Sequence, residues 1–167
     1  MYTAAFSSEI KEIIKASRDI ALETGYDYIS TIHLFLADCR LNLPGSIRKY
    51  AFKDDDQLNQ FIASSKIGDP PHGYQQLTLP LTKEAEDAIN HAEGQRINHK
   101  QQLIKPCHIF LAAAADTTSL FTACYPDEPN LYDSLCLYYT EEGVLKPEPR
   151  KAKQNFFSRL FKGLLKK

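Results

Sequence analysis

The chain has 167 residues, of which 43% are hydrophobic and 25% charged, and its formal net charge is −1. This composition is typical of a soluble globular protein, and the absence of any stretch near 18 apolar residues excludes a membrane-spanning helix. Charged residues among the first twenty positions exclude a secretory signal. Residues 1–149 hold 13 of the 20 basic residues and all 21 acidic ones, a net charge of −8, whereas residues 150–167 carry seven basic residues and no acid.

The first predicted element is a helix that begins after Ser7 and ends near Gly25. Its apolar and small residues recur with the spacing of one helical face, Ser7 can cap the helix, and Glu9 lies in the first turn, where the helix dipole favours a carboxylate. A second helix is expected to begin at Thr31 and to carry the phrase HLFLA. Two further helices, near 46–50 and over 54–65, complete the first half, and Gly and Pro residues mark the following segment as a connecting loop.

The second half repeats the first with a shift of 75 residues. The segment FSSEIKEIIKAS aligns without a gap on LTKEAEDAINHA, and HLFLA at 33–37 aligns on HIFLA at 108–112. The second half is therefore expected to contain a helix capped by Thr82, one that begins at Pro106, and two more over 119–124 and 130–140. The predicted fold class is all-α, a pseudo-twofold tandem repeat of two four-helix units over residues 1–142. The halves cover about 4–66 and 79–142.

Residues 143–152 are predicted to form a linker containing two prolines, and 153–167 a basic amphipathic helix. The partner-binding residues predicted there are Phe156, Phe157, Arg159, Leu160, Phe161, Lys162, Leu164 and Leu165. Such a helix suits the acidic groove of a partner protein, an anionic membrane, or the acidic body of this same chain. Nucleic acid is not an expected partner, because the body is acidic and the large apolar residues of the tail contribute little to phosphate contacts.

The doubled pattern resembles the amino-terminal domain of Clp unfoldases, a tandem repeat of four-helix units. In that family each half opens with an aromatic or apolar residue followed by Thr or Ser, here FSSEI and LTKEA, and later carries a Thr-Glu-His-Leu-Leu-Leu-like phrase, here TIHLFLA and KPCHIFLA. The ATPase modules that follow in Clp unfoldases contain a G-x-x-x-x-G-K-[ST] loop, which the 167 residues lack. The resemblance therefore implies a stand-alone binding domain without ATPase activity.

The resemblance also implies that partners bind to the body. The residues predicted to take part are Phe6, Ser7, Ser8, Tyr26 and Thr82. Some family members bind phosphorylated arginine through a Glu immediately before the repeated His, but Ile32 and Cys107 occupy those positions here. Neither side chain can make charge-assisted contacts with a guanidinium, which argues against phosphoarginine recognition.

His33 and His108 are expected to be structural residues of the repeat, each bonded to nearby backbone. No metal or cofactor is predicted, because Cys107 and His108 are adjacent and do not have the spacing of zinc ligands. A Cys107–His108 nucleophile pair is also not supported, since adjacent helical residues point in different directions. Cys39, Cys107, Cys124 and Cys136 form no C-x-x-C pair and lie in apolar segments, so buried free thiols in a reducing cytoplasm are expected.

The function predicted from the sequence is a non-enzymatic protein- or peptide-binding module. Its nearest concrete role is an adaptor or regulator of a Clp-type unfoldase and protease, or a component associated with contractile secretion. The expected partner is the unfoldase, one of its substrates, or a helix laid into an apolar groove of the body. The alternative is a peripheral membrane protein, anchored at the inner face of the membrane by residues 153–167. The expected location is the cytoplasm.

Overall fold

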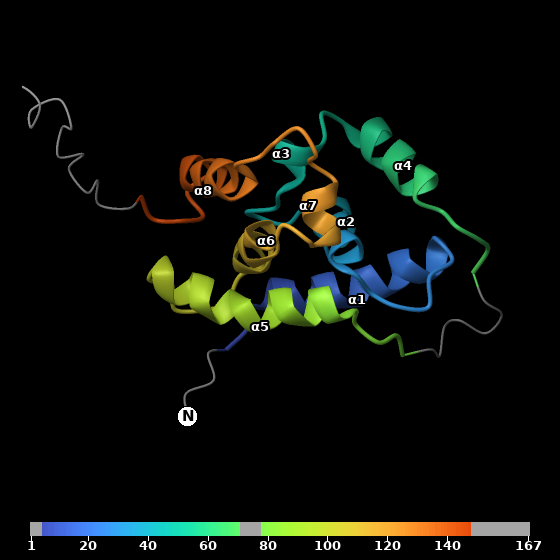
Figure 1. The fold of residues 1–167 in the computed structure, drawn as a ribbon, viewed down its shortest axis with the longest axis horizontal. Coiled ribbons are helices and arrows are strands. Elements are labelled where there is room, and N and C mark those ends of the chain that lie inside the picture. The colour runs from blue at the N-terminus through green and yellow to red at the C-terminus, as the bar shows by residue number, and fades with distance from the viewer. Residues whose placement is uncertain (1–4, 71–77, 148–167) are drawn as a thin grey trace, which may run out of the picture.

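The computed structural model of the protein describes residues 5–70 and 78–147. Within these residues the regular structure consists of helices, four in each half (Figure 1). The first half contains α1 (Ser8–Glu23), α2 (Thr31–Leu41), α3 (Arg48–Ala51) and α4 (Asp55–Ser64). The second contains α5 (Lys83–Asn98), α6 (Pro106–Ala115), α7 (Leu120–Ala123) and α8 (Leu131–Glu141). The predicted all-α double repeat is confirmed, whereas the predicted helix over 153–167 lies outside the described residues.

The helices form layers, with α2 and α6 in the middle (Figure 1). Helices α1 and α5 lie on one side of them, and α3, α4 and α8 lie on the other, while α7 packs beside α2 and α6. The most extensive packing is of α1 on α2 and of α5 on α6. Almost every residue of α2 and α6 is buried. The phrases HLFLA and HIFLA therefore occur twice because each half needs a central helix that is apolar on nearly all sides.

The two halves exchange backbone contacts in matched pairs. Phe6 forms a parallel β-bridge with Ile104, and Ile29 forms one with Leu81. The amide of Ser7 donates to the carbonyl of Ile104 at 2.9 Å, and the amide of Thr82 donates to the carbonyl of Ile29 at 2.8 Å. Phe6 and Leu81 are equivalent positions of the repeat, 75 residues apart, and so are Ile29 and Ile104. The two bridges are therefore equivalent, and the sequence repeat is also a pseudo-twofold relation in space.

The first two helices begin where the sequence predicts, but their capping contacts differ from the expectation. Ser7 is the N-cap residue of α1, but its hydroxyl makes no capping hydrogen bond. The N-cap residue of α2 is Ser30, while Thr31 is the first helical residue. Thr82 caps α5 as expected, since its Oγ1 accepts from the amide of Ala85 at 3.3 Å.

The hydroxyl of Thr31 forms hydrogen bonds with residues of the second half. Glu84, in the first turn of α5, accepts hydrogen bonds from the amide of Thr31 at 2.8 Å and from its Oγ1 at 2.6 Å. The same carboxylate accepts from the amide of Leu120 at 3.1 Å, and Oγ1 of Thr31 accepts from the amide of Phe121 at 3.0 Å. One carboxylate thus satisfies backbone donors at the amino-terminal ends of two helices, where negative charge is favoured.

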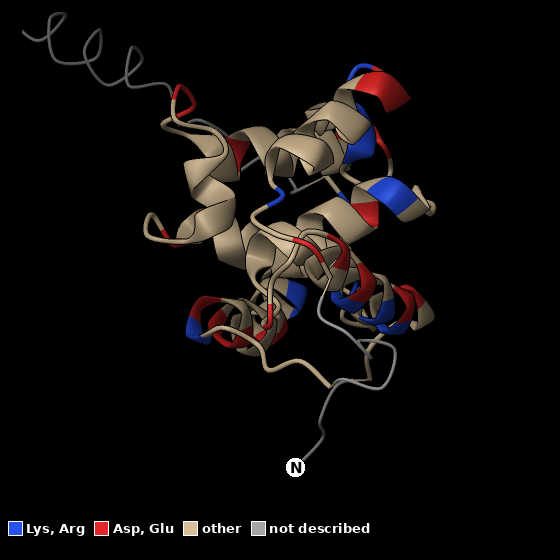
Figure 2. Cartoon of the chain, turned by 90° about the vertical axis from the view of Figure 1, so that its right-hand side faces the viewer, with Lys and Arg blue, Asp and Glu red and all other residues tan. Residues whose placement is uncertain are grey.

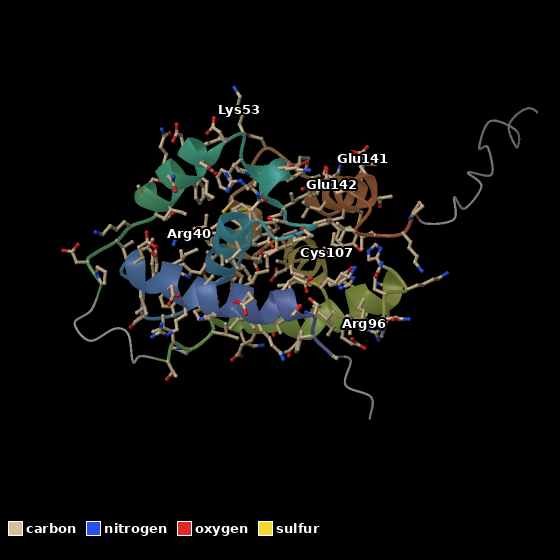
Figure 3. The ribbon with its side chains drawn as sticks, turned by 180° about the vertical axis from the view of Figure 1, so that it is seen from behind. Arg40, Lys53, Arg96, Cys107, Glu141 and Glu142 are labelled. Atoms are coloured by element: carbon tan, nitrogen blue, oxygen red, sulfur yellow. The ribbon has the colours of Figure 1, made fainter. Side chains whose placement is uncertain are left out.

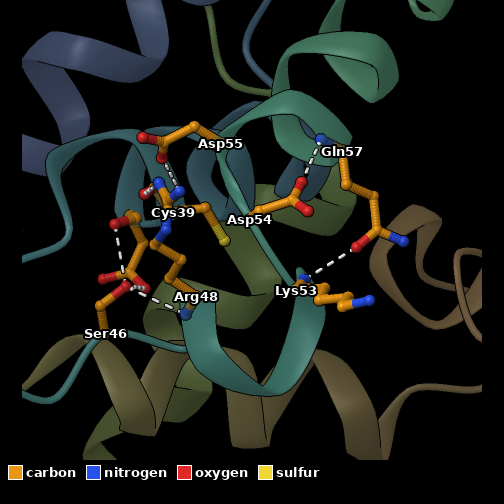
Figure 4. A network of polar contacts seen from close by, with 8 residues as sticks. Cys39, Ser46, Arg48, Lys53, Asp54, Asp55 and Gln57 are labelled. Atoms are coloured by element: carbon orange, nitrogen blue, oxygen red, sulfur yellow. Dashed lines mark hydrogen bonds and ion pairs between the residues drawn. The ribbon is translucent and has the colours of Figure 1, made fainter.

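A polar network attaches α3 and α4 to α2 (Figure 4). Asp38, buried in α2, accepts from Oγ of Ser46 and from the amide of Ile47, both at 2.8 Å, and its burial raises its pKa to about 6. Arg48 donates to the carbonyl of Cys39 at 3.0 Å and pairs with Asp55 at the start of α4. These contacts fix the amino-terminal end of α4.

Helix α8 and the residues next to it contact the first half through side chains. The hydroxyl of Tyr138 donates to the carbonyl of Ser46 at 2.8 Å, and Lys49 pairs with Glu142 at 3.0 Å. Ahead of α8, the hydroxyl of Tyr50 donates to Glu128. Beyond α8, Leu145 is buried and Val144 packs on the core, so the packed body includes two residues that the sequence placed in the linker.

Candidate functional site

The repeated histidines bond to backbone at the start of the two central helices. Nδ1 of His33 accepts from the amide of Ser30 at 3.0 Å, and Nδ1 of His108 accepts from the amide of Lys105 at 2.9 Å. Each imidazole therefore serves the N-cap amide as Glu or Gln does in a capping box. Burial is the main cause that lowers the pKa of each to about 4, with Glu84 partly opposing the shift at His33. Both rings are neutral at pH 7.

The five predicted binding residues of the body lie around the ends of α1 and α5. Phe6 is 43% exposed, Ser7 is buried, and Ser8 is exposed and donates to Glu9 at 3.4 Å. Thr82 is half-buried at its cap position. Tyr26 is half-buried, and its ring centroid lies 5.3 Å from that of Tyr28 and 4.8 Å from that of His33. The structure keeps Phe6, Ser7 and Ser8 together but places Tyr26 and Thr82 on other segments.

The positions that precede the repeated histidines offer no carboxylate to a ligand. Ile32 is half-buried. Cys107 is 1% exposed and lies among the helices (Figure 3), and burial raises its pKa to about 12. A buried, protonated thiol is neither a partner for a guanidinium nor an activated nucleophile.

Among the residues that the structure describes, no three His, Cys, Asp or Glu side chains are placed to hold a metal ion. The eight predicted binding residues of the tail, from Phe156 to Leu165, lie outside the described part of the chain. Within residues 5–70 and 78–147, no helix combines the length and the apolar character that crossing a membrane requires.

A hollow with several aromatic side chains in its lining lies between α4 and the end of α7. We call it the α4 groove; it has a volume of about 410 Å³. Its lining residues carry no charge, and they are Phe35, Ala51, Phe52, Gln57, Gln60, Phe61, Ser64, Cys124 and Tyr125. The five body residues predicted from the sequence are not among them. A volume in the range of about 300–1,000 Å³ with a mainly apolar lining and a few polar groups is usual for a binding pocket.

Four aromatic rings form the wall of the α4 groove. The ring of Phe52 lies 5.7 Å from those of Phe35 and Phe61, and the ring of Tyr125 lies 6.3 Å from that of Phe35. Phe35 and Phe52 are buried, whereas Phe61 and Tyr125 are half-buried. The buried pair therefore forms the floor, and Phe61 and Tyr125 present ring surface to the groove.

Tyr125 also borders a second hollow, which we call the α8 groove. This hollow has a volume of about 490 Å³ and lies between the end of α6, α7 and the start of α8. Its lining residues are Ala114, Thr117, Thr122, Ala123, Tyr125, Pro126, Glu128, Pro129, Asn130, Leu131, Tyr132 and Asp133. The hydroxyl of Tyr125 is buried and has no hydrogen-bond partner within the described residues, and burial raises its pKa.

Sequence reasoning missed the α4 groove because its residues come from four separate segments. Phe35 belongs to the repeated phrase, but Phe52, Phe61 and Tyr125 stand at positions that carry no motif. Whether such residues are buried in a core or line a surface hollow depends on how α4 sits against α2 and α7. The nearest signal in the sequence is Phe61, which stands beside the buried face of α4 formed by Leu58 and Ile62.

Residues 5–126 match the Clp repeat (R) N-terminal domain. The chain belongs to this family. Clp N-terminal domains are the protein-binding modules of Clp chaperones and contain no ATPase module. Helix α8 and everything after it lie beyond the matched residues.

Solved structures of the same fold support the architecture. A chain from a malarial protein secretion system shares 12% identity with a TM-score of 0.62, with coverage of 82% of this chain and 93% of that one. The N-terminal domain of ClpD from Arabidopsis thaliana shares 17% identity (TM-score 0.58; coverage 84% and 97%). The Hsp104 N-terminal domain from Candida albicans shares 16% (TM-score 0.59; coverage 84% and 93%). Among curated proteins, no sequence matches this chain significantly.

Proposed function

We propose that this Clp N-terminal domain acts as a non-enzymatic adaptor or regulator that receives a helix or peptide of a partner in the α4 groove. The partner class is a Clp-type unfoldase, one of its substrates, or a component of contractile secretion machinery. The observation that carries the proposal is the uncharged, aromatic-walled lining of the α4 groove on the surface of a protein-binding family.

The chemistry of the groove favours apolar side chains from the partner. Burying an apolar side chain against Phe61 and Tyr125 contributes roughly 25 cal/mol for each Å² removed from water. Gln57 and Gln60 stand at the groove on α4, where amides can bond to the backbone of a bound peptide. An amphipathic helix would present its anchors to the rings at spacings of three and four residues.

The test uses two isosteric substitutions on neighbouring residues of α4. Gln60→Glu introduces one negative charge at the α4 groove, and Asn59→Asp introduces the same charge outside the groove, because Asn59 lines a different hollow with Glu23 and Arg40. Both positions are exposed, so neither substitution should alter the fold. Circular dichroism during thermal unfolding checks this.

The measurement is affinity capture from native cell extract, followed by titration of the captured protein in purified form. We expect the unchanged protein and Asn59→Asp to retain a Clp-type unfoldase, its substrate or a sheath-like protein. Gln60→Glu should weaken the purified complex about tenfold, because a charge would then be desolvated without a partner. Equal affinities for the two variants would exclude the α4 groove, and capture of none of these partner classes would remove the adaptor assignment.

A second candidate function is peripheral membrane binding by residues 153–167. The observation that favours it is the sequence pattern of that segment, with basic residues flanking six large apolar ones. Flotation of the protein with anionic vesicles, compared with a chain that ends at Leu145, tests this function. Binding by the full chain alone would support it, and equal recovery of the two would exclude it.

A further inference from the structure

The face of the molecule formed by α8 and the α8 groove is apolar at its centre and acidic around it. Leu137 is 61% exposed on α8. Asp133 and Glu141 are exposed four residues before and after it, so the three side chains share one face of the helix. Glu141, the last residue of α8, and Glu142, its C-cap residue, lie near each other in Figure 3. At the other end of α8, the groove includes the carboxylates of Glu128 and Asp133.

This region differs in charge from the rest of the fold. Residues 106–145 contain six acidic residues and no Lys or Arg. Helices α1 and α5, by contrast, carry both signs, as the blue and red segments on the two lower helices of Figure 2 show. Lys49 of α3 pairs with Glu142, which leaves Asp133 and Glu141 without an ion pair among the described residues.

The remaining chain has the complementary chemistry. Residues 150–167 carry seven basic residues and no acid, and the apolar residues between 156 and 165 recur at the spacing of one helical face. The segment is also attached next to this surface, because Leu145 is buried in the core directly after α8. Helix α8 spans about 15 Å, and the ten residues 146–155 reach about 30 Å when extended, so the tail can fold back along α8 to the α8 groove.

We propose that residues 153–167 dock in cis on the α8 groove and on the exposed face of α8. Apolar residues of the tail cover Leu137 and enter the groove, while its basic residues lie against Asp133 and Glu141. A docked tail borders the α4 groove, since both hollows share Tyr125. The proposal does not depend on which partner occupies the α4 groove.

The test places a single fluorophore in the tail of the full chain. The protein contains no Trp, so Phe157→Trp gives a signal from that position alone. We expect the Trp emission to be shifted to shorter wavelength, and acrylamide to quench it several-fold less than it quenches the urea-unfolded chain. High salt should remove the protection, because exposed ion pairs are screened. Phe161→Trp serves as a second reporter.

Matched variants locate the docking surface. Glu141→Lys and Leu137→Ser should each expose the Trp, whereas Glu12→Lys, an equal charge change at an exposed position of α1, should leave it protected. In the protein without Trp, trypsin should cleave the tail several-fold faster in Glu141→Lys than in Glu12→Lys.

Three results would overturn the proposal. The first is a Trp that is as accessible at low salt as in urea, or one whose protection Glu141→Lys and Leu137→Ser do not change. The second is protection that rises with protein concentration, which would assign the surface to the tail of another copy. The third is protection that appears only with anionic vesicles, which would assign the tail to a membrane.

Discussion

His33 and His108 show how one residue type can fix the start of a helix and make the fold sensitive to acid. Each imidazole accepts an N-cap amide through Nδ1, and this requires the neutral ring. The pKa of each is lowered from 6.5 to about 4 by burial. As the pH falls, each imidazole is protonated near pH 6.5 in the unfolded chain but only near pH 4 in the folded protein. The stability that the neutral imidazoles contribute is therefore complete above pH 6.5 and is lost as the pH falls towards 4.

His33→Gln should reduce this acid sensitivity. Gln at the same position can accept the Ser30 amide, so we expect a loss of only about 1 kcal/mol in the free energy of unfolding at pH 7. Between pH 6.5 and 4.5 the variant should lose less stability than the unchanged protein, by about 2 kcal/mol at the acid end. Urea unfolding at several pH values measures this, with His91→Gln at an exposed position of α5 as the control. An unchanged pH dependence would contradict the structural role of His33.

At the scale of elements, the end of α1 determines where the segment after α4 lies. Gly25 follows the α1 C-cap residue, Thr24, with φ of +89°, a conformation that favours glycine. A Cβ on Gly25 would stand 2.8 Å from the backbone nitrogen and oxygen of Gly68. The amide of Ile67 also donates to the carbonyl of Thr24 at 2.9 Å. The absence of a side chain at Gly25 therefore allows the two backbones to meet.

Gly25→Ala and Gly94→Ala should have opposite effects on stability. At Gly25 we expect a loss of more than about 2 kcal/mol, because the substitution combines positive φ with a backbone clash. Gly94 lies inside α5 with no atom within 4 Å of an added Cβ, so Ala there should add about 0.5–1 kcal/mol. Thermal and urea unfolding of both variants measures the difference. Similar effects at the two sites would contradict the close approach of Gly25 to Gly68.

At the scale of the whole molecule, the halves are related by symmetry but joined unequally. Glu84 accepts three hydrogen bonds from Thr31 and Leu120. Its repeat mate is Glu9, and the mate of Thr31 is Pro106, which has no amide hydrogen and no hydroxyl. Glu9 instead accepts from the exposed hydroxyl of Ser8. Only one of the two equivalent carboxylates therefore holds the halves together.

Glu84→Ala should cost about 2–3 kcal/mol in the free energy of unfolding, because it leaves the partly buried amide and hydroxyl of Thr31 without their acceptor and also removes the acceptor of the exposed Leu120 amide. Glu9→Ala, the same substitution at the mate position, should cost less than about 0.5 kcal/mol. Hydrogen exchange should also show faster opening at Thr31 and Phe121 in Glu84→Ala. Equal losses for the two variants would show that the joint between the halves does not rest on Glu84.

The helical content and the repeat could be predicted from the order of residues alone. Periodic apolar residues marked each helix, and the 75-residue shift related Phe6 to Leu81 and Ile29 to Ile104, which the structure pairs crosswise across the halves. These features depend on the spacing of apolar residues within each helix and on the fact that similar sequence segments adopt similar structures. They can therefore be predicted from the sequence. The resemblance of the doubled motifs to Clp N-terminal domains followed from the same regularity.

The surface hollows and the contacts between the halves follow from the packing of the helices in three dimensions. The α4 groove is lined by residues from distant segments, among them Phe35, Phe52, Phe61 and Tyr125. The hydrogen bond from the Thr31 hydroxyl to Glu84 likewise joins residues 53 positions apart. Exposure of Leu137 on α8 depends likewise on which neighbours cover that helix. Surface hollows and contacts between halves arise from the packing angles of helices, and these are set by many side chains at once rather than by any one stretch of sequence.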